Sequence, residues 1–467
     1  MTQTETRKMV TSQVKKQPGN PANLISGTLA VALMLAATKW GSYLGANPIF
    51  VTDMLIALAV LSRLVAFARS GSRDLSGWAR LASPSPLLVM FMAFVAIRFT
   101  TSLGYFESIV VLRDAVPYLY GILAFLSASS VARASECERA LTVKVLWAAL
   151  LFHLFWTSVI VLTGFDTLSL PTMTNSDVHF LTIRPDIDAA VLGVTAGALL
   201  RQALFGRRTW VALLGAALAT VTVLQLETRA GLVSLTLSLA VAVITSMGSL
   251  PHRSMRRASI ALLIALALPG VLAFIPSTPL GQRIMATVNS AQTTSTARAE
   301  AQGTQTARQL AWVRVANWTG DTPSRQVFGT GFGTDFLAQS GAQVFLEGTT
   351  YENVRSPHNW LIATYARLGL IGLGLAGLLL LQITRLMWAN RARIGEDDLL
   401  SMATLIVLAI LPVALLGVVL EAPFGAVPFF WAAGILLTMR RPQLTNQQPH
   451  TNASPHKNSQ AFNATAS

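Results

Sequence analysis

The chain has 467 residues, of which 52% are hydrophobic and only 12% are charged, and its formal net charge is +14. Soluble domains carry about 25% charged residues, so this composition excludes an ordinary soluble protein and indicates a membrane protein. The single cysteine, Cys137, excludes an internal disulfide framework and a cysteine-rich metal site. The basic excess does not indicate nucleic-acid binding, because the basic residues are scattered through short loops between apolar segments.

Apolar runs recur along the chain, and each is long enough to cross a bilayer, which takes about 20 helical residues. They predict an all-α polytopic membrane protein of about twelve transmembrane helices, with one large extracytoplasmic loop between helices 9 and 10. The expected helices cover residues 24–46, 48–69, 85–103, 108–127, 140–163, 186–204, 209–225, 229–247, 258–276, 358–383, 399–420 and 424–439.

These helices divide the chain into five regions. Residues 1–23 form an N-terminal tail, residues 24–276 hold helices 1–9, and residues 277–357 form the large loop. Residues 358–439 hold helices 10–12. Residues 440–467 are rich in Asn, Gln, Ser and Thr, which predicts a disordered tail.

The distribution of Lys and Arg predicts the orientation. Basic residues occur in both tails and in every even-numbered loop, as with Arg69, Arg73 and Arg80 in the second loop. Because loops that stay in the cytoplasm carry the excess of Lys and Arg, both termini are expected there. The large loop is then expected on the outer face of the cytoplasmic membrane.

Several basic residues lie at the predicted outer ends of helices, although Lys and Arg are normally enriched on the cytoplasmic side. They are Lys39, Arg98, Arg113, Arg184 and Arg229. Ionisable groups in a span are costly unless they are paired or face a cavity, and guanidinium groups suit phosphate oxygens through paired hydrogen bonds. The pattern therefore points to an anionic ligand on the outer side, although Lys39 could simply extend to the lipid headgroups.

Simple ion pairing is an alternative for two of the arginines. Arg98 has Glu107 as a candidate partner, and Arg113 has Asp114 or Asp53. Either interpretation fits the sequence.

Arg184 and Arg229 are the stronger candidates for a binding role, because they lie at outer loop–helix junctions, where helix N-termini also favour anions. Glu227 could pair with Arg229. Glu421 is either a partner for one of the arginines or a part of the site. Arg367, inside helix 10, is expected to be paired internally, with contact to a lipid diphosphate as the alternative.

The segment Ser356-Pro357-His358-Asn359 joins the large loop to helix 10. Ser356 is a favourable N-cap and Pro357 suits the first helical position, so His358 is predicted in the first helical turn. The partial positive charge there disfavours an imidazolium. This leaves a neutral imidazole that can act as a general base, with Asn359 to orient it or to bind a sugar hydroxyl. An interfacial histidine without chemistry fits the same residues.

Further motifs flank this segment. Arg308, Trp312 and Gly329-Thr330-Gly331-Phe332-Gly333 precede it, and Gly369-Leu370-Ile371-Gly372 follows it. In this order, and on the large loop and the next helix, they resemble the signature region of the O-antigen ligase/polymerase superfamily of bacterial membrane glycosyltransferases.

The resemblance implies a metal-independent, inverting GT-C-type enzyme without a cofactor. It implies transfer of a glycan from polyprenyl (undecaprenyl) diphosphate to the hydroxyl of a glycan, lipid A-core or other envelope acceptor. It implies that His358 is the catalytic base and that Arg184 and Arg229 bind the diphosphate. The remaining candidates for substrate contact are Arg308, Asn359, Arg113 and Glu421.

Other interpretations stay open. Asp186 and Asp188 could bind a metal ion that holds a phosphate, or cap the helix at whose start they lie. A repeat-unit polymerase would use the same donor chemistry as a ligase. A transporter or flippase for lipid-linked sugars is disfavoured, because the sequence shows no internal repeat and the cations gather on one side.

Overall fold

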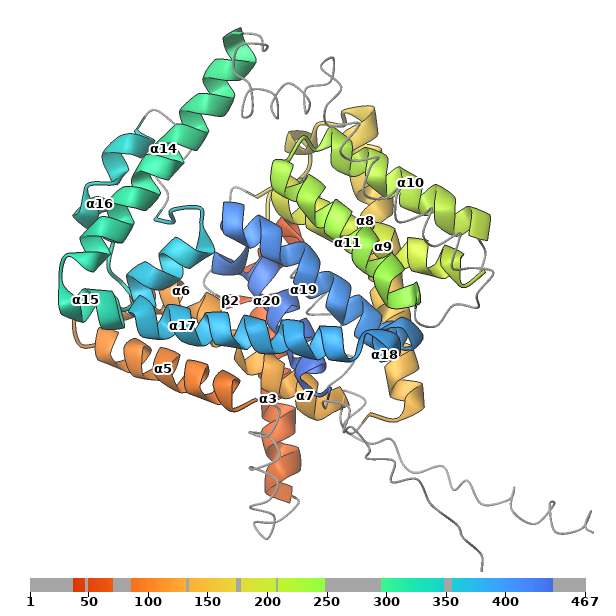
Figure 1. Ribbon diagram of the computed structural model, residues 1–467, viewed down its shortest axis with the longest axis horizontal. Coiled ribbons are helices and arrows are strands. Elements are labelled where there is room, and N and C mark those ends of the chain that lie inside the picture. Colours follow the sequence, from red (N-terminus) through yellow and green to blue (C-terminus); the bar gives the residue numbers. More distant parts are fainter. Residues whose placement is uncertain are drawn as a thin grey trace, which may run out of the picture.

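The computed structural model describes residues 37–46, 49–69, 85–131, 134–173, 178–206, 209–247, 295–347 and 355–439. Two antiparallel strands of two residues each, β1 (Gly45–Ala46) and β2 (Ile49–Phe50), interrupt an otherwise helical fold in these ranges. The predicted all-α class is therefore confirmed for the described residues (Figure 1).

Six helical segments are long and apolar enough to cross a membrane. They are α6 (Ser108–Leu119) continued by α7 (Ile122–Val131), α8 (Glu136–Thr163), α9 (Pro185–Leu204), α11 (Arg229–Met247), α17 (Trp360–Ala389) and α19 (Asp398–Leu416). Three shorter apolar helices accompany them, α5 (Pro86–Ser102), α10 (Thr209–Gln225) and α20 (Pro423–Leu437), together with the apolar segment Val51–Ser62 of α3 (Val51–Arg69). Each falls on a predicted span.

The remaining two predicted spans are not tested. Residues 258–276 lie outside the described part of the chain. Of the predicted span 24–46, residues 24–36 also lie outside it, and the described remainder contains the short helix α2 (Lys39–Ser42). The tails 1–23 and 440–467 also lie outside it. The total of twelve spans therefore stays a prediction.

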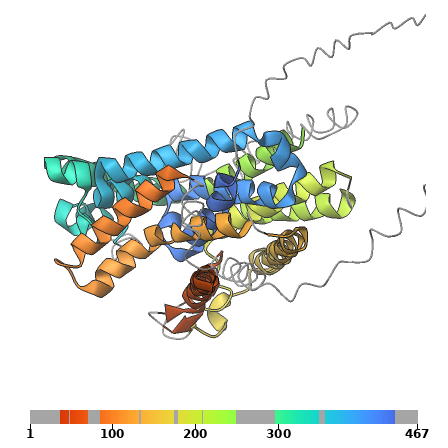
Figure 2. The same cartoon turned by 90° about the horizontal axis from the view of Figure 1, so that it is seen from below.

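The large loop contains helices of its own. These are α14 (Ser295–Gly320), α15 (Pro323–Phe328), α16 (Phe336–Ser340) and the 3-10 turn η3 (Gln343–Leu346). Buried Val315 and Phe336 of this segment pack with Ala363 and Ala366 of α17. Helices α14–α16 lie at one end of an elongated body and α10 at the other, with α19 and α20 between them (Figures 1 and 2).

Small residues let α9 and α11 approach closely. A Cβ on Gly193 would lie 3.3 Å from the Leu235 backbone, and one on Gly197 would lie 2.9 Å from the carbonyl oxygen of Ser238. Small residues at such crossings are typical of helix packing in membranes. Because the contact positions advance together along both helices, α9 and α11 run parallel. Their N-termini, and so Arg184 and Arg229, lie at the same end of the bundle.

Ion pairs tie the other end of α9 to its neighbours. Arg201 of α9 bonds to Asp398, and Arg139 of α8 bonds to Asp397. Both carboxylates lie where the short helix α18 (Arg391–Glu396) joins α19. We call this group of four side chains the Arg201 clasp.

Candidate functional site

The end of the bundle opposite the Arg201 clasp gathers six chain segments. They are the N-termini of α9, α11, α17 and α20, the C-terminus of α19 and the 3-10 turn η4 (Val419–Glu421). A Cβ on Gly417, just after α19, would lie 3.4 Å from a carboxylate oxygen of Asp186. This contact brings the end of α19 against the start of α9.

The prediction that Ser356 caps the helix and that His358 lies in its first turn is wrong. Helix α17 begins at Trp360, and Asn359 is its N-cap, with Oδ1 accepting from the N–H groups of Leu361 and Ile362 at 3.0 and 3.3 Å. An asparagine carbonyl caps as well as a serine hydroxyl. His358 therefore precedes the helix.

The backbone of His358 has φ +55, in the left-handed region. Residues other than glycine seldom adopt this conformation, which costs about 1–3 kcal/mol. Two hydroxyl contacts stabilise it locally: the Ser356 Oγ accepts from the His358 N–H at 3.1 Å and donates to Oε1 of Glu421 at 2.8 Å.

Glu421 in turn belongs to a buried charge network. Its Oε2 accepts from Arg367 at 3.1 Å, and both side chains are only 6% exposed. Arg367 also lies 3.8 Å from Asp114 of α6. The predicted internal pairing of Arg367 is confirmed, and Glu421 is one of its partners.

Asp114 connects this charge network to the large loop. Its Oδ2 accepts from Arg355 at 3.3 Å and from the Gly333 N–H at 3.2 Å. Arg355 is not among the residues predicted from the sequence, although its position directly before Ser356 is a usable signal. Arg113, in contrast, lies 3.6 Å from Asp114, with 59% of its side chain exposed.

The glycine-rich segment of the large loop fits a break in α17. Gly369 has φ +64 inside the helix, which leaves the carbonyls of Ala366 and Arg367 free of their helical partners. They accept instead from the N–H groups of Thr330 and Gly331 at 2.8 and 2.9 Å. Arg98 of α5 donates to the Gly329 carbonyl at 3.1 Å and does not pair with Glu107.

The loop helix α14 also contacts the His358 segment directly. The indole N–H of Trp312 donates to the carbonyl of Pro357. One turn earlier, Arg308 donates to the carbonyl of Leu416 at 3.3 Å, beside Gly417. The signature arginine and tryptophan thus lie on the helical face toward the site.

His358 is held neutral by its surroundings. Burial, together with the positive charges of Arg308 and Arg184, lowers the pKa of the imidazole to about 3. A buried site penalises the charged form, and nearby cations add to the penalty. The structure thus places Arg184 and Arg308 within electrostatic range of His358.

Arg184 is oriented by several contacts. Its guanidinium donates to both carboxylate oxygens of Asp186, at 2.9 and 3.3 Å, and lies 4.5 Å from the ring centroid of Phe424. The planar fork of an arginine matches two phosphate oxygens in the same way. In the structure this fork is engaged by the two oxygens of the Asp186 carboxylate.

Arg229 opens α11 two residues before Gly231, which contacts Ala189 of α9. The backbone thus places it at the same end of the bundle as Arg184. Its side chain is partly buried.

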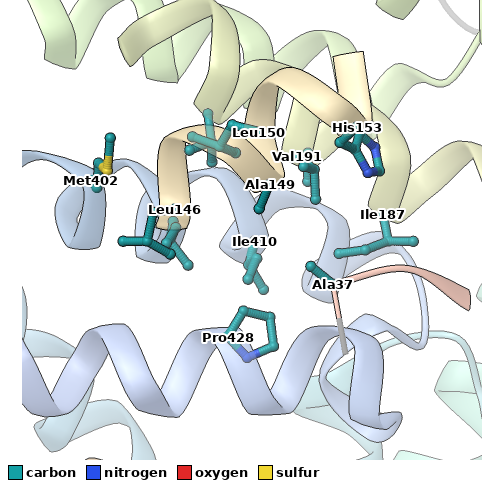
Figure 3. Close-up of a pocket in the computed structure, with 13 residues that line it drawn as sticks. Ala37, Leu146, Ala149, Leu150, His153, Ile187, Val191, Met402, Ile410 and Pro428 are labelled. Atoms are coloured by element: carbon teal, nitrogen blue, oxygen red, sulfur yellow. The ribbon is translucent and has the colours of Figure 1, made fainter. Parts of the chain in front are cut away.

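An apolar cavity of about 60 Å³ runs between α8, α9, α19 and α20. Figure 3 shows His153 and Ile187 at one end and Met402 near the other. Ile187 follows Arg184 by three residues, so this cavity reaches the first turn of α9. Among the described residues that line it, His153 alone has a polar side chain.

Comparison with known families supports the resemblance noted in the sequence. Residues 214–377 match the family described as O-antigen ligase. The matched region includes Arg229, Arg308 and His358, whereas Arg184 and Glu421 lie outside it. No curated protein matches the chain significantly.

Proposed function

Because residues 214–377 assign this chain to the O-antigen ligase/polymerase superfamily, we propose that it transfers a glycan from polyprenyl diphosphate to an acceptor hydroxyl. At the level of the family it is a multi-pass membrane glycosyltransferase of the ligase or polymerase type. The observation that carries the finer proposal is the neutral His358 within electrostatic range of Arg184 and Arg308. We place the reaction at the outer face of the cytoplasmic membrane, without a metal ion.

His358 would act as the general base. It accepts the proton of the acceptor hydroxyl as that oxygen attacks the anomeric carbon, while the bond from this carbon to the diphosphate oxygen breaks with its electron pair. Inversion follows from attack opposite the leaving group. The lowered pKa keeps the imidazole ready to accept a proton, and an arriving diphosphate would offset the arginine charges and increase its basicity.

Arg184 and Arg229 would hold the departing diphosphate. Negative charge grows on this group in the transition state, and one well-placed donor contributes about 3 kcal/mol. The pairing of Arg184 with Asp186 supports this role, because it preserves a two-oxygen geometry that phosphate can replace.

The other candidate residues receive different roles from their contacts. Arg308 would complement the donor charge beside His358. Asn359 and Glu421 would act on the backbone around His358. Oδ1 of Asn359 already accepts from the N–H of Leu361 in the first turn of α17, and Oε1 of Glu421 accepts from the Ser356 hydroxyl. Arg113, largely exposed, remains a candidate for contact with the acceptor.

The apolar cavity would receive the first isoprenoid units of the carrier. Its lining on α9 comprises Ile187, Ala190, Val191 and Val194, which lie on one helical face below Arg184. A ligand with its diphosphate at Arg184 can therefore continue as hydrocarbon along this face.

The test is transfer by the purified protein in nanodiscs, with a lipid-linked glycan donor and its acceptor. We expect His358→Ala to abolish transfer, and Arg184→Ala and Arg229→Ala to impair it far more than Lys39→Ala. Arg391→Ala, near the Arg201 clasp, is a control of matched chemistry. Full transfer by the His358 variant would disprove the base assignment, and equal activity of Arg184→Ala and Arg391→Ala would disprove diphosphate binding.

Two further measurements refine the proposal. EDTA should not reduce transfer, and activity that depends on added metal would instead favour a metal site at Asp186 and Asp188. In a deletion strain, accumulated full-length lipid-linked polymer indicates a ligase. Accumulated single repeat units indicate a polymerase.

A further inference from the structure

A buried histidine and a buried carboxylate face each other behind Arg184. Nε2 of His153, in α8, lies 3.4 Å from Oδ1 of Asp188, in α9, and the two side chains are 5% and 0% exposed. Neither atom has another hydrogen-bond partner in the described part of the chain. Burying a carboxylate is costly unless it is paired or hydrogen-bonded, and a carboxylate buried inside a membrane span usually has a functional role.

The other oxygen of Asp188 fixes the backbone of Arg184. Oδ2 accepts from the Arg184 N–H at 2.6 Å, and the Asp188 N–H donates to the Arg184 carbonyl at 3.0 Å. Both backbone polar groups of Arg184 are therefore bonded to one residue. Asp188 therefore fixes the backbone from which the Arg184 side chain extends. Asp186 separately holds the guanidinium group at the end of that side chain.

Aromatic rings close the other sides of the pair. Trp156 meets the His153 ring edge-on, with ring centroids 5.0 Å apart, and Trp40 packs against Trp156 at 6.3 Å. On the remaining side His153 lines the end of the apolar cavity (Figure 3). No charged group other than those around Arg184 contacts Asp188 among the described residues.

We propose that Asp188, supported by His153, is a positioning residue that fixes the backbone of Arg184 and so directs its guanidinium toward the donor diphosphate. This inference rests on the proposed function. An ordinary helix cap would explain only the bond to the Arg184 N–H. It would not require complete burial of the carboxylate or a facing imidazole, because capping carboxylates function in contact with water.

The inference is tested by affinity for a defined probe, farnesyl diphosphate, measured by calorimetry on the full-length protein in detergent. Asp188→Ala should weaken binding about tenfold, a coupling expected for residues in direct contact. Asp188→Asn keeps an acceptor for the Arg184 N–H and should recover most of the affinity. His153→Phe keeps the ring packing on Trp156 and should weaken binding by a smaller factor.

The deciding measurement is a double-mutant cycle. In an Arg184→Ala background, Asp188→Ala should cause no further loss of affinity, because it acts through Arg184. Thr195→Val, a buried change two turns along α9, is the control for general helix disturbance. The KM for the lipid-linked donor should follow the affinity in each variant.

The outcomes are distinguishable. If Asp188→Ala adds its full effect to that of Arg184→Ala, or lowers only the melting temperature, the positioning role is disproved while the proposed function stands. If Asp188→Ala does not fold, His153→Phe gives the same comparison in the double-mutant cycle. A wild-type protein that neither binds the probe nor transfers glycan overturns both proposals.

Discussion

The indole N–H of Trp312 donates to the carbonyl of Pro357, 45 residues away in the chain and directly before His358. This bond joins the loop helix α14 to a backbone held at φ +55. Ser356 and Asn359 anchor the same segment from the other side. The conformation of His358 is therefore maintained by contacts from outside its own helix, as strained backbone requires.

Trp312→Phe should lower transfer about fivefold with little change in melting temperature. The substitution keeps the ring packing but removes one hydrogen bond, whose net contribution is about 1 kcal/mol. The measurement is kcat in nanodiscs beside thermal melting. Trp388→Phe, at an exposed tryptophan near the Arg201 clasp, should change neither quantity. Equal activity of the two variants would contradict the anchoring role.

Gly369→Ala should prevent the loop helices from docking on α17. A Cβ there would lie 2.4 Å from the Val327 carbonyl oxygen and 2.5 Å from the Gly329 nitrogen, at a φ of +64. The strained backbone alone costs about 1–3 kcal/mol, and these backbone atoms cannot move aside cheaply. We expect reduced folded yield and faster proteolysis of residues 295–347. Gly374→Ala, on the same helix with no atom within 4 Å of its Cβ, should behave like the wild type.

Arg308→Gln should shift the acid limb of the pH–rate profile to higher pH. In the wild type, burial and the charges of Arg308 and Arg184 lower the pKa of His358 to about 3, so the base is neutral throughout the physiological range. Removing one cation favours the imidazolium, which raises this pKa toward its ordinary value of 6.5. As the pH falls, the variant then loses its base at a higher pH than the wild type does.

The pH dependence is measured as kcat/KM, which reports the free enzyme. Arg325→Gln is the matched control, since Arg325 stacks on Trp318 within the same loop segment. Its acid limb should coincide with that of the wild type. An unshifted limb in Arg308→Gln would mean that its charge does not reach His358.

Glu421→Gln should mainly lower the stability of the protein, whereas Ser356→Ala should mainly lower its activity. Glu421→Gln removes a charge from a buried pair with Arg367, which should destabilise the protein by about 3 kcal/mol. Ser356→Ala leaves that pair intact but removes the acceptor for the His358 N–H. It should reduce transfer while the melting temperature stays near that of the wild type. A large drop in melting temperature for Ser356→Ala would refute this division.

Arg201→Ala should destabilise the protein without affecting the chemistry per folded molecule. It leaves Asp398 without its partner at the Arg201 clasp. The clasp lies 17 residues along α9 from Arg184, or about 25 Å by helical rise. Melting temperature and specific activity of the folded fraction are the two measurements. A lowered kcat in the folded fraction would indicate coupling between the two ends.

The amino-acid sequence predicted the membrane class and the ten apolar helices that the structure describes, six of which are long enough to cross a bilayer. These follow from local composition, because a bilayer requires long apolar helices and penalises isolated charge. It also indicated that Arg367 would be paired internally, since a charge that deep in a helix needs a partner.

Only the tertiary structure decided how these residues combine. The N-cap of α17 is Asn359 and not Ser356, and the Ser356 hydroxyl instead donates to Glu421, 65 residues away. The partner of Arg98 and one partner of Asp114 come from the glycine-rich segment, and the imidazole that faces Asp188 comes from another helix. Sequence spacing specifies neighbours along one helix, whereas a buried charge is satisfied by whichever element packs against it, and that depends on the assembled bundle.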